Sequence, residues 1–162
     1  MLYHVDTFTN YVCRLNVTTG QTERLFLEDY VSVIIPIAGL YNRFIVSRRN
    51  QLLDLDWTTR RYRVLKLVGP EKFNDGKVDA LGRLWIGTLR NFDRHSNNGA
   101  LRNGGGLYRL DGINLVKVDR YSLPNGMAWS LDSKKFFVVD TNERLINVYD
   151  YDLRTGAIGK CS

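Results

Sequence analysis

No apolar run in the 162-residue sequence approaches the ~20 residues that a membrane-spanning helix needs. The first ten residues, MLYHVDTFTN, have neither the basic start nor the apolar centre of a signal peptide. We therefore expect a cytoplasmic protein with no membrane partner.

Cysteine is scarce: Cys13 and Cys161 are the only two, and neither lies in a C-x-x-C motif. This excludes a disulfide framework and a cysteine zinc site, so we expect two reduced thiols. The motifs G-x-S-x-G and H-E-x-x-H are also absent. The sequence therefore has neither the nucleophile motif of an α/β-hydrolase nor the zinc-binding motif of a metalloprotease.

Basic residues give a net charge of +6 but do not gather in one stripe. Pairs such as Arg48-Arg49 and Arg60-Arg61 lie next to turn signals and not along one helical face. A nucleic-acid-binding surface would need such a stripe. The dispersed charge therefore indicates a solvated surface and no nucleic-acid partner.

No window has a convincing helical period, and there are only three prolines. Short runs with apolar residues at every second position, separated by turn signals, predict an all-β fold. These runs are YVCRLNV, QTERLFL, VSVIIPI, RFIVSRR, QLLDLDW, RYRVLKL, RLWIG, GLYRL, NLVKV, KKFFVVD and LINVYDY.

The chain also repeats itself. Residues 3–21 and 137–157 share a strand ending in Val-Asp-Thr, a short loop, an alternating strand and a Thr-Gly turn. Repeats of a few short strands are typical of a β-propeller. At ~40–50 residues per blade, the length predicts about four blades.

Four collinear segments carry a resemblance to a known family: KFNDGKVDALGRLWIGT, GGLYRLDG, LPNGMAWSLDSKKFFVVDT and VYDYDLRTGAI. They resemble the regucalcin/gluconolactonase family, also called the senescence marker protein family, which includes luciferin-regenerating enzymes. The resemblance implies a six-bladed propeller that binds one divalent cation (Ca, Zn, Mn or Mg) and hydrolyses a small-molecule sugar lactone. It implies that residues 1–162 are a single partial propeller domain, truncated at both ends.

The resemblance also implies site residues. Asn125 matches the family's metal-binding Asn, Asn74 matches a polar residue near metal and substrate, and Lys72 stands where many members carry a substrate-contacting Arg. Arginine binds a planar group through two parallel hydrogen bonds, whereas lysine offers only a point charge. The lysine at position 72 is therefore expected to affect substrate preference. The family's metal-binding Glu and its general-base Asp have no counterpart in the chain, so no catalytic residue is assigned.

Each assigned residue has a plainer alternative. Asn125-Gly126 is a strong β-turn signal, and Asn74-Asp75-Gly76 also fits a turn. Asp79 and Asp132 belong to turn sequences, where an aspartate commonly accepts hydrogen bonds from nearby backbone amides.

Residues 90–106 form a long Asn- and Gly-rich segment that predicts either a lid over the channel or an irregular surface loop. An incomplete propeller exposes strand edges, so self-association is expected as well.

Two functions follow as hypotheses. The first is a metal-dependent lactone hydrolase, weak or inactive in this chain because two metal-binding carboxylates are missing. The second is a non-catalytic calcium-binding or interaction propeller fragment.

Overall fold

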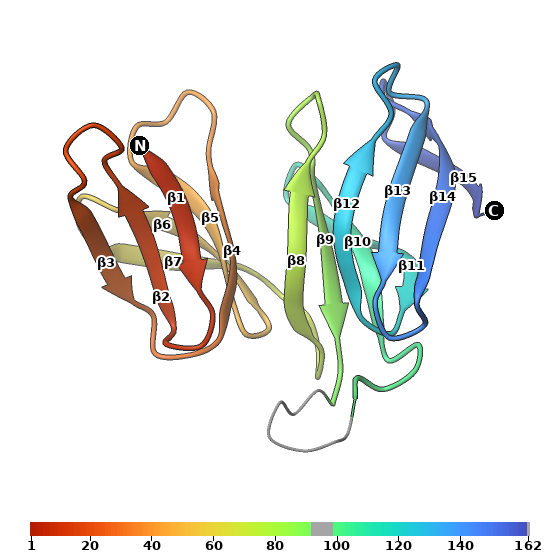
Figure 1. Ribbon diagram of the computed structural model, residues 1–162, viewed down its shortest axis with the longest axis horizontal. Coiled ribbons are helices and arrows are strands. Elements are labelled where there is room, and N and C mark those ends of the chain that lie inside the picture. The colour runs from red at the N-terminus through yellow and green to blue at the C-terminus, as the bar shows by residue number, and fades with distance from the viewer. Residues whose placement is uncertain (92–98, 162) are drawn as a thin grey trace. The chain divides into compact units, whose positions relative to one another are not determined.

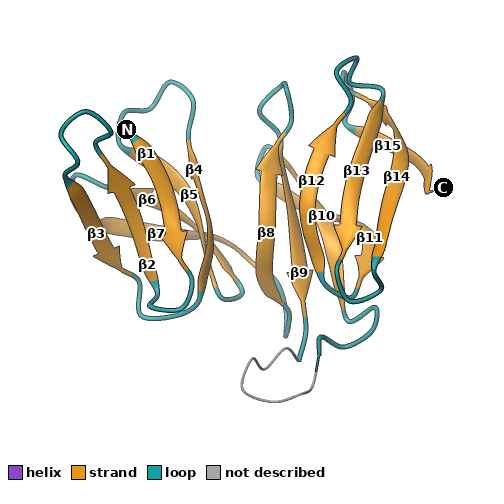
Figure 2. Ribbon diagram, viewed as in Figure 1, coloured by secondary structure: helices purple, strands orange, loops and turns teal. Residues whose placement is uncertain are grey.

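The computed structural model describes residues 1–91 and 99–161. Within these ranges fifteen strands form four antiparallel sheets joined by loops, as Figures 1 and 2 show. The described residues contain no helix that is long and apolar enough to cross a membrane. The predicted all-β class is therefore confirmed.

The described chain divides into two compact units, and the first, Met1–Phe73, contains two complete sheets. The strands of the three-stranded sheet are β1 (Leu2–Asp6), β2 (Tyr11–Leu15) and β3 (Thr22–Phe26). The strands of the four-stranded sheet are β4 (Val31–Pro36), β5 (Arg43–Arg48), β6 (Gln51–Asp56) and β7 (Arg61–Leu67). Consecutive strands are neighbours throughout, which is the up-and-down order of a propeller blade.

The second unit, Asn74–Ser162, holds the other two sheets. One has the order β11-β10-β9-β8, with β8 (Lys72–Val78), β9 (Leu84–Leu89), β10 (Gly105–Asp111) and β11 (Asn114–Tyr121). The other has β12 (Pro124–Trp129), β13 (Lys135–Asp140), β14 (Leu145–Asp152) and β15 (Ala157–Cys161) in that order. Strand β8 starts two residues before the boundary between the units.

The repeat seen in the sequence is a repeated turn in the structure. At its first position a side-chain oxygen, Oδ1 of Asn16 or of Asp152, accepts a hydrogen bond from the amide two residues on. Asp56 does the same in a third copy that the sequence comparison missed. The fifth residue of each turn has a positive φ: Gly20 (73°), Arg60 (60°) and Gly156 (71°). An arginine at this position hides the third turn from a search for Thr-Gly.

Apolar and aromatic side chains join the two sheets of the first unit. Val12 from β2 packs in one buried cluster with Phe44, Val46 and Trp57 of the next sheet. The guanidinium groups of Arg14 and Arg60 lie 4.9 and 5.1 Å from the Trp57 ring, within cation–π range. Glu23 accepts hydrogen bonds from Arg14 (2.9 Å) and from the Trp57 indole (3.3 Å).

The second unit has a similar aromatic cluster between its sheets. Trp85 of β9 lies 4.7 Å from Phe136 and 5.9 Å from Tyr151, measured between ring centroids. Trp129 stacks on Phe136 at 4.5 Å with an interplanar angle of 10°. Tryptophan thus packs between the sheets of both units, with Trp57 in the first and Trp85 and Trp129 in the second.

A buried polar contact also joins the sheets of this second unit. Asp79, in the turn after β8, accepts hydrogen bonds from the Tyr151 hydroxyl of β14 (2.5 Å) and from Arg83 Nε (2.7 Å). Arg83 in turn donates to the carbonyl oxygens of Leu153 and Arg154. Burial would raise the pKa of Asp79, but the hydrogen bonds from Tyr151 and Arg83 lower it below its usual value. Burial, and then the hydrogen bond to Asp79, raises the pKa of Tyr151 from 10.0 to about 12.

Candidate functional site

Asn125-Gly126 lies inside strand β12 and not in a turn between strands. Asn125 pairs with Val139 and Met127 with Val138, so Gly126 is the extra residue of a β-bulge. Its φ of +41° is one that glycine adopts easily. The β-turn alternative for this dipeptide is therefore wrong, and the bulge re-aims the backbone next to Asn125.

The Asn74-Asp75-Gly76 segment is likewise part of a strand, β8, and the turn follows later, at Gly82 (φ 81°). The turn alternative is wrong here too. Both asparagines thus lie on strands at the edges of their sheets, next to β9 in one case and β13 in the other.

The two asparagine side chains meet, although the residues are 51 positions apart in the sequence. Asn74 Nδ2 donates to Asn125 Oδ1 at 2.7 Å and to the carbonyl oxygen of Pro124 at 2.8 Å. Asn125 Nδ2 donates to Thr141 Oγ1 at 2.8 Å. We call Asn74 and Asn125 the carboxamide pair. Its hydrogen bonds fix which end of the Asn125 amide is the acceptor.

Three supporting residues were missed by sequence reasoning. Thr141 orients Asn125, whereas the sequence comparison treated it only as the end of a repeated strand. Pro124 supplies the carbonyl group that holds Asn74. Gly87 of β9 lies against the Pro124 ring so closely that an added Cβ would overlap it. Gly87 stood in one of the recognised motifs, but its role depends on packing between two sheets.

Lys72, the third predicted site residue, belongs to the first unit. Its ammonium group lies 4.7 Å from the centroid of the Tyr30 ring. The next residue, Phe73, donates its backbone N–H to Arg49 O at 2.8 Å, and Arg49 donates its own to Tyr30 O at 2.7 Å. The backbone of Arg49 therefore links the residues beside Lys72 to Tyr30.

A divalent cation needs more ligands than these residues offer. A carboxamide oxygen has two lone pairs, and Asn125 Oδ1 uses one for Asn74, which leaves one neutral acceptor. Among the residues that the structure describes, no group of three or more His, Cys, Asp or Glu side chains could hold a metal. Hard cations are held mainly by carboxylates, so the residues present do not by themselves complete a cation site.

The predicted lid, residues 90–106, is only partly described, because residues 92–98 lie outside the described ranges. Its last two residues belong to strand β10. Glycines are needed there, since a Cβ at Gly105 would overlap the Thr88 carbonyl group and one at Gly106 would overlap the Lys117 side chain. Glycine at these two positions reflects close packing, and a lid stays a prediction for the rest of the segment.

Three comparisons place the chain among known proteins. The family model for the SMP-30/gluconolactonase/LRE-like region matches residues 1–162. Regucalcin of Gallus gallus is 33% identical over 162 residues, covering 96% of this chain and 52% of its own length. The chain therefore spans about half the length of the curated relatives it matches.

Solved structures agree. A luciferin-regenerating enzyme is 29% identical with a TM-score of 0.89, covering 99% of this chain and 55% of that one. A calcium-binding protein, regucalcin from Agrobacterium tumefaciens, is 22% identical with a TM-score of 0.82, covering 96% of this chain and 52% of that one. The second likeness concerns the fold alone. With four sheets of three or four strands within the described residues, these neighbours confirm the predicted propeller class with about four blades.

Proposed function

Because the chain belongs to the SMP-30/gluconolactonase/LRE-like family, we propose that its residues serve metal-dependent hydrolysis of a sugar lactone. In this proposal Asn125 supplies one neutral oxygen ligand to a divalent cation (calcium, zinc, manganese or magnesium), and Asn74 and Lys72 contact the sugar. The lactone substrate, the cation and a cytoplasmic location stay predictions.

The carboxamide pair is the observation that carries the proposal. Asn74 and Asn125 come from different sheets of the second unit, and their side chains meet at 2.7 Å with defined donor and acceptor ends. An asparagine whose only purpose is a turn would bond to its own neighbouring backbone. These two instead hold one acceptor oxygen in a fixed orientation, and that is what a ligand-binding carboxamide needs.

The chemistry assigns separate tasks to these residues. A divalent cation polarises the carbonyl group of a lactone and lowers the pKa of bound water. Asn74 keeps the Asn125 carbonyl oxygen oriented, and Lys72 offers a positive charge held over the Tyr30 ring. Lysine pairs with a substrate oxygen as a point charge, so it constrains geometry less than the arginine of many relatives.

A non-catalytic calcium-binding fragment is the second candidate. Within the described ranges the structure has no acidic group that would hold a catalytic cation tightly, and this favours a non-catalytic role over hydrolysis. The two candidates separate on activity: calcium binding without gluconolactone hydrolysis at saturating calcium would support the second one.

We expect this chain to bind calcium weakly, at roughly millimolar dissociation constants, because affinity rises with the number of charged ligands. Gluconolactone hydrolysis should be slow or absent. Calorimetric titration and pH-stat assays measure the two properties.

The Asn125→Asp variant sharpens this test, since it adds one charged ligand at the proposed position. Calcium affinity should rise about tenfold. Asn114→Asp adds the same charge at an exposed position at the start of β11 and should have no effect. Micromolar affinity of the unchanged chain, or equal gains from both variants, would contradict the proposal.

Self-association also stays a prediction. Each described sheet has two edge strands, and unpaired strand edges can pair with another chain. The edge strands are β1, β3, β4, β7, β8, β11, β12 and β15.

A further inference from the structure

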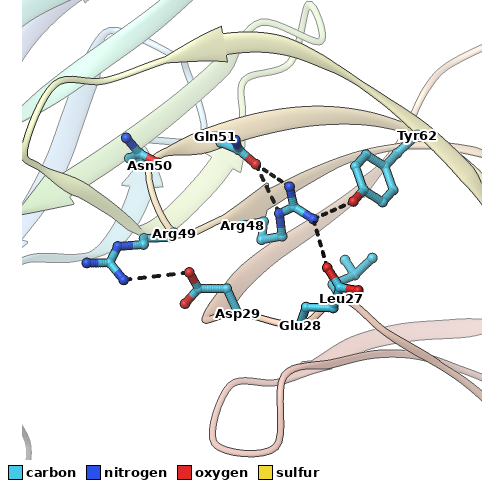
Figure 3. A pocket seen from close by; sticks show the side chains of 8 residues that line it. All are labelled: Leu27, Glu28, Asp29, Arg48, Arg49, Asn50, Gln51 and Tyr62. Atoms are coloured by element: carbon cyan, nitrogen blue, oxygen red, sulfur yellow. Dashed lines mark hydrogen bonds and ion pairs between the residues drawn. The ribbon is translucent and has the colours of Figure 1, made fainter.

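A pocket of about 350 Å³ lies within the first unit, between the β3–β4 connection and the β5–β6 hairpin. Figure 3 shows its lining side chains. One wall is Leu27–Asp29 and the other is Arg48–Gln51, with Tyr62 of β7 beside it. No sequence pattern indicates this pocket, and the sequence analysis interprets Arg48-Arg49 as dispersed surface charge.

Two long ion pairs join the oppositely charged walls of the pocket. Arg48 Nη1 lies 4.0 Å from Glu28 Oε2, and Arg49 Nη1 lies 3.7 Å from Asp29 Oδ2. A charge-assisted hydrogen bond between such groups is ~2.7–2.9 Å long. Both ion pairs are therefore longer than a direct hydrogen bond, so a ligand with groups of both kinds can replace them at little cost.

The two arginines are held very differently. Arg48 donates to Gln51 Oε1 from Nε (3.0 Å) and Nη2 (2.6 Å) and to the Tyr62 hydroxyl (2.6 Å), and its guanidinium lies 4.7 Å from the Tyr62 ring centroid. Arg49 has a side chain that is 67% exposed and is paired with Asp29 at 3.7 Å. The side chain of Arg48 is therefore held in place, whereas the exposed side chain of Arg49 can change rotamer to contact a ligand.

Each wall contains a residue with a positive φ. Glu28 has a φ of 65° and Arg49 a φ of 49°, in the left-handed region that glycine adopts more easily than other residues. The backbone bonds of Arg49 to Tyr30 and Phe73 would form equally with glycine there. The backbone hydrogen bonds therefore do not explain why an arginine side chain occupies this position.

We propose that this pocket binds a small carboxylate that carries a hydroxyl or an ammonium group on the neighbouring carbon. The planar guanidinium of Arg49 matches a carboxylate through two parallel hydrogen bonds. Glu28 and Asp29 provide acceptors on the opposite wall for the ligand's hydroxyl or ammonium donors. The pocket's own charges balance, so a ligand with both an acceptor end and a donor end fits it. The proposal does not depend on lactone hydrolysis.

Amide chemical shifts from ¹H–¹⁵N NMR test the proposal on the full chain. Gluconate represents the hydroxy acids and alanine the amino acids, while acetate has only the carboxylate and sorbitol only the hydroxyls. Gluconate or alanine should cause saturable shifts at residues 27–29 and 48–51, with dissociation constants of roughly 1–10 mM. Acetate and sorbitol should bind at least about tenfold more weakly. Whichever acid binds more tightly identifies the ligand class.

Arg49→Gly separates binding from folding. It removes the guanidinium, keeps the backbone hydrogen bonds and relieves the positive φ, so the melting temperature should be unchanged or higher. Binding should weaken by at least about tenfold. Arg24→Gln, which removes an exposed arginine of β3, should leave binding unchanged. Equal binding of all four probes, no saturable shift by about 50 mM, or full binding by the glycine variant would overturn the proposal.

Discussion

The two units join their sheets in different ways. In the first unit the polar contacts lie at the rim: Glu23, whose side chain is 44% exposed, bonds to Arg14 and to the Trp57 indole. In the second unit the polar contact lies inside, since the Asp79 side chain is 0% exposed and bonds to Tyr151 and Arg83. Since water compensates for a lost rim contact and not for a lost buried one, the packing between the two sheets should depend far more on polar residues in the second unit than in the first.

Removing Asp79 should produce the largest effect. Asp79→Ala leaves the Tyr151 hydroxyl and the Arg83 guanidinium without their buried acceptor, which should lower the free energy of unfolding by about 3–5 kcal/mol. Urea denaturation measures the loss, and hydrogen exchange should locate it in strands β8–β15. Asp150→Ala, which removes an exposed carboxylate paired with Lys135, is the matched control. Equal losses from both variants would show that burial does not decide the outcome.

Alkaline pH should weaken the second unit selectively. The pKa of Tyr151 is about 12 in the folded protein against an ordinary 10.0, so folding favours the protonated hydroxyl. This contribution is fully present below pH 10 and is lost as the pH rises to about 12, up to roughly 2–3 kcal/mol. Hydrogen exchange and urea midpoints between pH 9 and 12 measure it against Tyr151→Phe. A variant with the same alkaline slope as the unchanged chain would refute the role of Tyr151.

Changing the rim contact should have the smallest effect. Glu23→Gln keeps an acceptor for Trp57 and removes only a charge that solvent already screens, so the urea midpoint should not move measurably. Trp57→Ala at the same contact should instead lower the free energy of unfolding by about 3–5 kcal/mol, because it empties a buried aromatic site. A large drop in the free energy of unfolding of Glu23→Gln would show that the two units do not differ in this respect.

Sequence patterns predicted most strands well and the asparagine strands poorly. Strands such as β4, with Val-Ser-Val, and β14, with Tyr-Asp-Tyr-Asp, alternate clearly. Strands β8 and β12 instead carry Asn and Gly, which are depleted in strands and signal turns. Strand β15 was also absent from the alternating runs. The alternating runs thus miss both strands that hold the carboxamide pair. Only the family resemblance indicated these two asparagines.

Long-range partners were beyond the reach of local patterns. Asp79 was predicted to be a turn residue, and its Oδ1 does accept from the Leu81 and Arg83 amides. Its Oδ2 also binds Tyr151, 72 positions away, and nothing near Asp79 in the sequence signals that contact. The Arg49 pocket was missed for the same reason, because its acidic wall comes from a different loop.

The missing side chain at Gly87 has a consequence for how this protein can change. The ring of Pro124 packs against Gly87, and its carbonyl oxygen accepts a hydrogen bond from Asn74. A change in the distance between β9 and β12 would therefore also change the orientation of the Asn74 side chain. Substitutions cannot alter one without the other. A wider or narrower ligand would require the blades to be repacked first.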